Sequence, residues 1–402
     1  QPPDGNHLEE SGGDGGMKTN KIRLGEQCVV TSSKRFHLSE RITQGVPFYC
    51  SKEIIKKFNG EDVTECDYIS EDLYKKVSNE FGVPKENDLL ITTRGTIGIP
   101  YLYKRTDRFY FADGNLTWIK DFDSNLYSKF LYYWFQSYEG RKKFEALAKG
   151  TAQKAVPISG IKTLEIELPS LKSQKRIADI LSAYDDLIEN NQKQIKLLEE
   201  AAQRLYKEWF VDLRFPEHEN TKIVDGVPEG WIKEEIGKII KKVHRTKQIV
   251  ASEYKDEGSI PIVDQSRAFV AGYTNDLEAR VDFGIPIIVF GDHTRIVKLI
   301  QFPFAKGADG TQLIISDCLE MPQRLLYCSI MNVDLSNYHY ARHFKYLKEE
   351  KIMIPTVKVA NEFENNVTGI FSKIQNCRDE IIRCQKTRNL LLPKLMSGEV
   401  EA

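Results

Sequence analysis

The sequence contains two colinear copies of one pattern, and this repeat limits the possible folds more than any other feature. The tripeptide Ala-Asp-Gly occurs at 112–114 and again at 308–310, 196 positions later. Similar segments keep the same chain order in both halves: GVPFY (45–49) with SIPIV (259–263), ITTRGTIGI (91–99) with IVFGDHTRI (288–296), and ELP (167–169) with MIP (353–355). The offset falls from 214 to 197 to 186, as one duplication followed by deletions in the second copy would leave. We therefore predict two copies of one unit.

A heptad pattern ends each unit. Apolar residues from position 177 onward follow one another at alternating spacings of four and three, and the pattern recurs 186 positions later. This spacing is typical of the contact seam of a coiled coil. The predicted seam consists of Ile177, Leu181, Tyr184, Ile188, Asn191, Ile195, Leu198 and Leu205 in the first helix, and of Phe363, Val367, Ile370, Ile374, Ile381, Leu391 and Leu395 in the second. Asn191 is polar, as is Arg388 near the end of the second seam, and such residues reduce stability but can fix the register.

The two long helices are expected to pair with each other, and to do so antiparallel, because a whole globular part separates them along the chain. The alternative is that each helix is an amphipathic core helix packed on its own domain. Against this alternative, the heptad pattern is longer than the usual helix of about 10–14 residues, and the flanking positions are highly charged.

Short apolar runs and helical stretches alternate in the globular parts, which predicts an α+β fold. The runs at 88–93, 163–168 and 286–290 are typical of strands, and those at 126–137 and 318–332 of helices. The expected divisions are an expression tail at 1–16, a first globular domain at 17–170, its helix at 171–212, a linker rich in Pro, Gly and charge at 213–230, a second globular domain at 231–356 and its helix at 357–397.

Composition and motifs argue against several classes of protein. The net charge is −1, so any contact with nucleic acid has to come from local patches. No apolar run approaches the roughly 18 residues that span a bilayer. Seven scattered cysteines without a Cys-x-x-Cys pair indicate a reducing cytoplasm. The sequence has neither a Gly-rich phosphate-binding motif nor a nucleophile elbow. An amino-methyltransferase would need a Pro-Pro-aromatic loop to hold the flipped base, but the Pro-Pro pair of this sequence lies in the tail. We therefore predict no catalytic residues.

Two smaller patterns could be mistaken for functional sites. Asp113-Gly114 and Asp309-Gly310 resemble duplicated catalytic acids, but Asp-Gly before a strand is more often a turn. His339 and His343 stand four positions apart without a third ligand, so we predict no metal site.

Basic and polar residues gather near the predicted loops of both units. Arg and Lys can neutralise phosphates, while Arg, Gln, Asn and His can reach base edges. The candidate DNA-binding residues are Lys34, Arg35, Arg94, Thr96, Lys149, Thr151, Gln153 and Lys154 in the first unit, and Arg245, Lys247, His293, Thr294, Arg295, Tyr340, Arg342 and His343 in the second. Any single one could be ordinary solvated surface, but as a group in both copies they favour a nucleic-acid surface.

The helix and linker segments resemble a known family. The run LPSLKSQKRIADILSAYDDLIENNQKQIKLLEEAAQRLYKEWFVDLRFP (168–216), followed by GVPEGW and the closing LLLPKLMSGEV, is similar to the specificity subunit of type I restriction-modification enzymes, as is FGDHTR followed by FPFAKGADGT. The resemblance covers the chain from Met17 onward. It implies two target-recognition domains, each followed by a conserved helix, with the helices forming an antiparallel coiled coil.

The resemblance also implies a function. The chain would read an asymmetric, bipartite sequence of double-stranded DNA without methylating or cutting it. Two modification subunits would transfer a methyl group from S-adenosylmethionine to adenine, and restriction subunits would add ATP- and Mg-dependent cleavage, so no cofactor is expected in this chain and no membrane is involved. The rival interpretation is a coiled-coil adaptor that binds proteins only, and salt-dependent retention on DNA would separate the two.

Three mechanistic hypotheses follow. A seam of about 35–38 residues is roughly 50–57 Å long, which would cap the separation of the two domains near about 15–17 base pairs and make the helix pair a ruler. The loop with Arg94 and Thr96, like its counterpart at 293–295, is expected to read bases. The modification subunits are expected on exposed helix faces, near Glu199 and Glu200.

Overall fold

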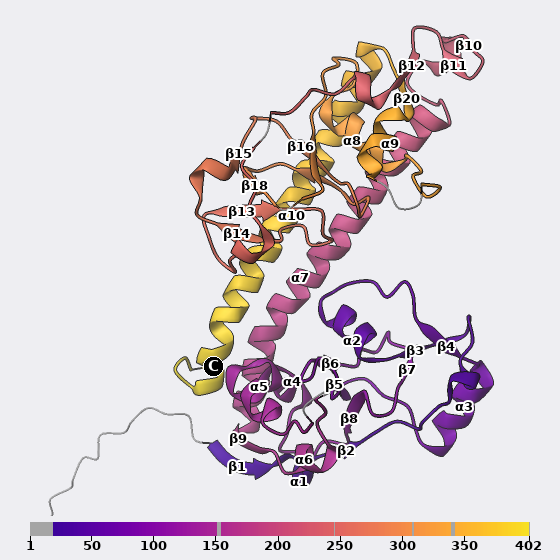
Figure 1. Cartoon of the computed structure of the whole chain (residues 1–402). Coiled ribbons are helices and arrows are strands. Elements are labelled where there is room, and N and C mark those ends of the chain that lie inside the picture. The colour runs from indigo at the N-terminus through magenta and orange to yellow at the C-terminus, as the bar shows by residue number, and fades with distance from the viewer. Residues whose placement is uncertain (1–18, 151–153, 245, 308, 339–341, 402) are drawn as a thin grey trace, which may run out of the picture. The chain divides into compact units, whose positions relative to one another are not determined.

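The computed structural model describes residues 19–150, 154–244, 246–307, 309–338 and 342–401. The chain forms two compact units (Figure 1). The first unit is Gln1–Gln192 together with Glu380–Ala402, and the second is Lys193–Asp379. The divisions fall inside the two long helices, so each unit contains one globular part and a portion of both helices.

The first globular part is closed by pairing of its two ends. Strand β1 (Thr19–Arg23) pairs antiparallel with β9 (Glu165–Pro169). A four-stranded sheet has the order β2-β8-β5-β6, formed by Val29–Thr31, Leu116–Lys120, Leu89–Thr92 and Pro100–Leu102. A three-stranded sheet has the order β4-β3-β7, formed by Asp67–Ile69, Val46–Tyr49 and Tyr110–Phe111, with β3 antiparallel to β4 and parallel to β7.

The helices of the first globular part are short and locally encoded. They are α1 (Leu24–Gln27), η1 (Leu38–Glu40), α2 (Ser51–Phe58), α3 (Glu71–Glu80), α4 (Ser128–Gln136), α5 (Tyr138–Glu145) and α6 (Ile158–Lys162). Helix α3 begins after Ser70, whose hydroxyl accepts the backbone N–H of Leu73, with Glu71 and Asp72 in its first turn. Helix α4 is apolar on nearly all sides because it is enclosed by the sheet and by the long helices.

The second globular part repeats this topology. Strands β12 (Ile232–Glu235) and β20 (Lys351–Ile354) pair antiparallel, as β1 and β9 do. Strand β13 (Ile260–Val263) is antiparallel to β14 (Gly272–Thr274) and parallel to β18 (Phe304–Lys306), as β3 is to β4 and β7. Strand β16 (Ile287–Gly291) lies between β17 (Val297–Ile300) and β19 (Thr311–Ile314), as β5 lies between β6 and β8. The prediction of two tandem α+β copies is confirmed.

The remaining elements of the second unit are short. Strand β15 (Arg280–Val281) pairs with β18, and β10 (Ile223–Val224) forms a hairpin with β11 (Val227–Pro228). The helical elements are η3 (His218–Asn220), η4 (Ile236–Lys238), η5 (Ala251–Glu253), η6 (Leu277–Ala279), α8 (Gln323–Met331) and α9 (His343–Glu349).

The long helices are α7 (Leu171–Tyr206), which continues as a π-turn, η2 (Lys207–Val211), and α10 (Val357–Ser397). In the second unit Glu199 pairs with Arg378, and the Trp209 ring lies 5.7 Å from Phe363. Residue numbers rise along α7 while they fall along α10, so the segments are antiparallel. The first unit contains the corresponding pair Asp185–Arg388. The predicted antiparallel pairing is confirmed.

All predicted seam residues are buried or half-buried. Asn191 is 3% exposed, and its amide donates to the carbonyl of Leu187, one turn earlier on the same helix, at 2.9 Å. This bond within α7 gives the buried amide nitrogen a partner, which explains how a polar residue is accommodated in the seam.

The alternative of two separate amphipathic helices is excluded by the cores. Leu392 and Leu395 of α10 belong to the core of the first unit, together with Ile177 and Leu181 of α7. Ala202 at the end of α7 belongs to the core of the second unit. Each core therefore uses both helices, and this is why the compact units differ from the domain divisions expected from the sequence.

The segment expected to be a linker is packed against the second unit. Phe215 is 3% exposed, and its ring lies 4.6 Å from that of Trp231. Glu217 forms an ion pair with Lys358 of α10 at 2.7 Å. Aromatic burial thus outweighs the Pro, Gly and charge content that suggested a flexible connection. Across the described residues, no helix is both long enough and apolar enough to cross a bilayer.

Candidate nucleic-acid interface

Four loops of the first unit meet at one end of its four-stranded sheet. The Ser32 hydroxyl donates to Oδ1 of Asp113 at 2.5 Å. The backbone N–H of Thr93 donates to the carbonyl of Asn115 at 2.9 Å, and the N–H of Val156 donates to the carbonyl of Thr93 at 2.9 Å. These bonds hold the loops 32–41, 93–99, 112–115 and 154–156 together. We call them the first loop cluster.

The first loop cluster carries the predicted residues of this unit that the structure describes. Lys34, Arg35, Arg94, Thr96, Lys149 and Lys154 are all exposed. Arg94 pairs through its backbone with Ala155, which also pairs with Lys149. Two segments that are separated by about fifty residues in sequence, one at Arg94 and one at 149–155, are therefore neighbours. The candidates Thr151 and Gln153 lie outside the described residues.

The loop between β5 and β6 presents Arg94 outward. Gly95 and Gly98 have φ values of +76° and +84°, which favour glycine, and the backbone N–H of Ile99 donates to the Thr92 hydroxyl at 2.9 Å. Within the described residues, Arg94 has no carboxylate at ion-pair distance. Its guanidinium is available for an anion or a base edge.

The duplicated Asp-Gly pairs occupy turns, as the sequence predicted. Asp113-Gly114 precedes β8, and Asp309-Gly310 precedes β19. Gly114 and Gly310 have φ values of +72° and +84°, a backbone conformation that explains glycine at both positions.

A hollow of about 540 Å³ adjoins the first loop cluster and is lined in part by Arg35, His37, Arg41 and Asp113. Arg41 already forms an ion pair with Asp67 at 2.6 Å and lies over the Phe48 ring. Its charge is therefore largely balanced within the protein, so this hollow mixes acidic and basic character.

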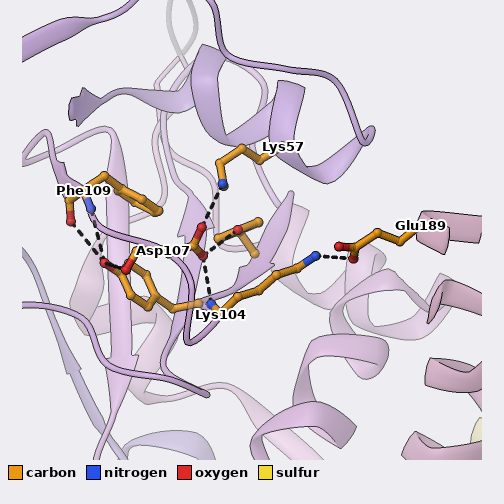
Figure 2. Close-up of polar contacts among 7 residues, drawn as sticks. Lys57, Lys104, Asp107, Phe109 and Glu189 are labelled. Carbon is orange, nitrogen blue, oxygen red and sulfur yellow. Dashed lines mark hydrogen bonds and ion pairs between the residues drawn. The ribbon is translucent and has the colours of Figure 1, made fainter. Parts of the chain in front are cut away.

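A buried carboxylate supports the opposite side of this globular part, and Figure 2 shows its contacts. Asp107 accepts hydrogen bonds from Nζ of Lys57 at 2.8 Å, from the Tyr101 hydroxyl at 2.7 Å and from the backbone N–H of Lys104 at 2.8 Å. Burial and the Asp107 charge raise the pKa of Tyr101, which keeps the phenol a donor. The Lys104 side chain reaches on to an ion pair with Glu189 of α7. The network thus connects the β6–β7 turn to the long helix.

In the second unit, the corresponding loops are held together by one glutamine. The side-chain Oε1 of Gln265 accepts a hydrogen bond from the backbone N–H of His293 at 3.1 Å. The backbone carbonyl of Gln265 accepts a hydrogen bond from the Thr294 hydroxyl at 2.6 Å. Its Nε2 donates to the carbonyl of Asp309 at 2.8 Å. Gln265 is not among the residues predicted from the sequence, because a glutamine after a strand carries no signal of such long-range bonding. His293 and Thr294 are exposed.

Arg295 is anchored inside the second unit rather than projecting freely. Its Nε donates to Nε2 of His343 at 3.2 Å, and one terminal nitrogen donates to the carbonyl of Tyr338 at 2.9 Å. Its backbone is left-handed, with φ at +60°, a conformation that a non-glycine residue adopts only when its surroundings hold it.

The expectation that His343 contacts DNA needs correction. The residue is 4% exposed, and burial together with Arg295 lowers its pKa. The ring is therefore neutral and supports Arg295, because it cannot reach a base edge from a buried position. Lys247 also differs from expectation, since it forms ion pairs with Asp276 at 2.7 Å and Glu278 at 2.9 Å, and these bonds raise its pKa. Arg342 is exposed, whereas Arg245 and Tyr340 lie outside the described residues.

Among the described residues, no group of three or more His, Cys, Asp and Glu side chains is arranged to hold a metal ion. His339, one of the two histidines considered from sequence, lies outside the described residues. The interface is therefore characterised by loops, exposed cations and amides.

Comparison with known proteins agrees with this arrangement. The family described as "Type I restriction modification DNA specificity domain" matches residues 18–200. The chain is 29% identical over 301 residues to the type I restriction enzyme MjaIX specificity subunit of Methanocaldococcus jannaschii, covering 68% of this chain and 69% of that protein. The family model and this relative indicate a specificity subunit of type I restriction-modification enzymes.

Two further proteins are similar to the chain, one in sequence and one in fold. The chain is 31% identical over 97 residues to the EcoR124I/EcoR124II specificity subunit of Escherichia coli, covering 24% of each. The crystal structure of a type I restriction-modification S subunit from M. genitalium shares the fold, with a TM-score of 0.59 over 97% of this chain and 98% of that chain at 16% identity. As a specificity subunit, the chain is a non-catalytic component whose role is DNA sequence specificity. Catalysis belongs to other subunits of the complex.

Proposed function

We propose that this specificity subunit reads an asymmetric, bipartite DNA target, with one half-site for each globular part. The observation that carries the proposal is that the same loop position presents different side chains in the two units. In the first unit the β5–β6 loop exposes Arg94 and Thr96, whereas in the second the β16–β17 loop exposes His293 and Thr294 and anchors Arg295. Two recognition loops that expose different side chains favour two different half-sites.

We further propose that the subunit recruits two modification subunits, which methylate an adenine in each half-site, and restriction subunits that cleave DNA. S-adenosylmethionine, ATP and Mg would bind to those partners. The cytoplasm, where the chromosome is accessible, is the proposed location. Exposed faces of α7, including Glu200, are the proposed contact surface for the modification subunits.

The long helices support a proposal for the spacing of the half-sites. Helices α7 and α10 contain 36 and 41 residues, and each is paired with the other inside each unit. A helix rises about 1.5 Å per residue, so each is long enough, at roughly 54–62 Å, to hold two readers apart. We propose that the length of the pair sets the number of base pairs between the half-sites.

Mapping methylated adenines tests the proposed function. The chain is co-expressed with its modification subunits in cells without other adenine methylation, and the modified positions are read by sequencing. The expected result is one asymmetric target with two defined parts and a spacer of constant length. Methylation at a palindromic target, or none in the presence of an intact complex, would contradict the proposal. If the chain bound partner proteins but was not retained on DNA, the rival interpretation of a coiled-coil adaptor that binds proteins only would be favoured.

A further inference from the structure

A basic hollow of about 790 Å³ lies in the second unit beside the β16–β17 loop. Phe344 lines it, and the backbone N–H of Phe344 donates to Oδ1 of Asp292, the first residue of that loop, at 2.8 Å. The lysines lining the hollow are Lys241, Lys242, Lys306 and Lys348, and His244 lies beside them. None of the described residues that line it is acidic.

The positive charge of this hollow is poorly balanced by the protein. Lys306, at the end of β18, is half-buried, and among the described residues no carboxylate lies at ion-pair distance from it. Burial lowers the pKa of Lys306, and the charge of Asp309 opposes this shift only in part, as expected for an ammonium group that has lost water without forming a close ion pair. Lys348 lies over the Phe344 ring at 5.2 Å, and Lys241 lies 3.7 Å from the carboxylate of Asp317.

The lining is unlike that of a site for a small organic ligand, which is mostly apolar with a few polar groups. Lysines act as point charges, which suits phosphate oxygens, whereas specific base contacts are made more often by the planar donors of arginine. Gln248, Gln312 and Thr246 add amide and hydroxyl donors to the same wall. A chain of phosphates fills an open hollow of this size better than a single ion does.

We infer that the hollow lined by Lys242, Lys306 and Lys348 binds the sugar-phosphate backbone of the DNA and positions the second half-site for reading by the adjacent loop. The inference rests on the proposed function and deepens it.

Salt dependence of binding tests the inference. The full chain, in complex with its modification subunits, is titrated with a fluorescent duplex of random sequence and with the mapped target between 50 and 200 mM KCl. The variants are Lys242→Gln, Lys306→Gln and the double substitution. The matched control is Lys247→Gln, because Lys247 lies in the same segment but is already paired with Asp276 and Glu278.

Each lost phosphate contact lowers the slope of log K against log salt by about 0.9, so the affinity ratio between the two salt concentrations shrinks by about threefold per contact. We expect this reduction for each single variant, about tenfold for the double, equally on both duplexes, and none for the control. Lys242 is exposed, so its variant tests the hollow without disturbing packing. Unchanged slopes in the single and double variants would overturn the inference, as would a loss confined to the target duplex. Failure of the unaltered complex to prefer its target would instead overturn the proposed function.

Discussion

Arg388 of α10 donates a hydrogen bond to Oδ1 of Asp185 on α7 at 2.5 Å, and the two side chains are 25% and 26% exposed. The other oxygen of Asp185 accepts the Tyr133 hydroxyl of α4 at 2.6 Å. One carboxylate therefore joins both long helices to the globular part of the first unit. Arg388, a polar interruption in the heptad pattern, has its charge balanced across the helix pair.

Replacing this carboxylate should destabilise the first unit. Asp185→Ala leaves Arg388 without its counter-charge and Tyr133 without its acceptor. Breaking a fully buried pair costs about 3–5 kcal/mol, and partial exposure reduces this to about 2 kcal/mol. Urea denaturation followed by circular dichroism measures the change. Glu200→Ala is the control, because the Glu200–Arg204 pair is exposed and 3.7 Å long, and it should cost less than about 0.5 kcal/mol. Equal losses for the two variants would refute the assigned role of Asp185.

The Asp107 network should be more important for folding than the ion pair that extends from it. The Asp107 side chain is 7% exposed, and Asp107→Ala leaves Lys57 and Tyr101 without an acceptor. We expect a loss of about 3 kcal/mol. Lys104→Met removes only the pair with Glu189, whose side chains are 50% and 40% exposed, and should cost under about 1 kcal/mol. Thermal unfolding of both variants measures the two losses of stability. A larger loss for Lys104→Met than for Asp107→Ala would contradict the greater importance assigned to the Asp107 network.

The repeat and the helices were readable from the sequence because both depend on spacing. Colinear offsets survive divergence, and the repeated pairing of β3 and β13 with parallel and antiparallel neighbours reflects that duplication. A heptad seam is local to one helix, so burial of residues such as Ile188 and Ile374 follows from their period alone.

The fine structure of the interface depends on contacts that spacing does not encode. The carboxylates that pair with Lys247 come from about thirty residues later, in η6 and the residue before it. His343 looks like a surface ligand in its polar segment, but tertiary packing buries it against Arg295. Phe215 lies in a segment whose composition suggests a loop. Its burial depends on packing against Trp231, a contact that the local sequence does not encode.

Arg94 is expected to read a base in the first half-site. Arg94→Ala should weaken binding of the target by about 1–3 kcal/mol and relax specificity at one position of that half-site only. Arg94→Lys is the matched variant, since lysine retains a phosphate contact but cannot form the bidentate bond to guanine. Competition binding with targets substituted at each position measures the effect. If Arg94→Lys preserves specificity, or if Arg94→Ala weakens random DNA equally, Arg94 is a phosphate contact.

Acid should destabilise the second unit through His343. Burial and Arg295 lower the pKa of this histidine, so the folded protein takes up its proton less readily than the unfolded chain, whose value is about 6.5. Its contribution to stability is complete above about pH 6.5 and is lost as the pH falls toward the lowered value. The melting temperature of the chain should therefore fall more between pH 7.5 and 5.5 than that of His343→Gln, whose amide can accept from Arg295 without titrating. If the melting temperatures of the two proteins changed equally with pH, His343 would not titrate in this way.

Lengthening both helices should move the half-sites apart. One heptad is inserted after Gln192 in α7 and one after Asp379 in α10, the positions where the compact units divide. Seven residues add about 10.5 Å, close to three base pairs, and preserve the seam on both helices. Sequencing of methylated DNA should therefore show a spacer longer by about three base pairs with both half-sites unchanged. The control inserts the heptad in α7 alone, which leaves seven residues without partners and should reduce methylation without creating a new spacer. An unchanged spacer with the double insertion would exclude the helix pair as the ruler, because the separation of the readers would then be set elsewhere.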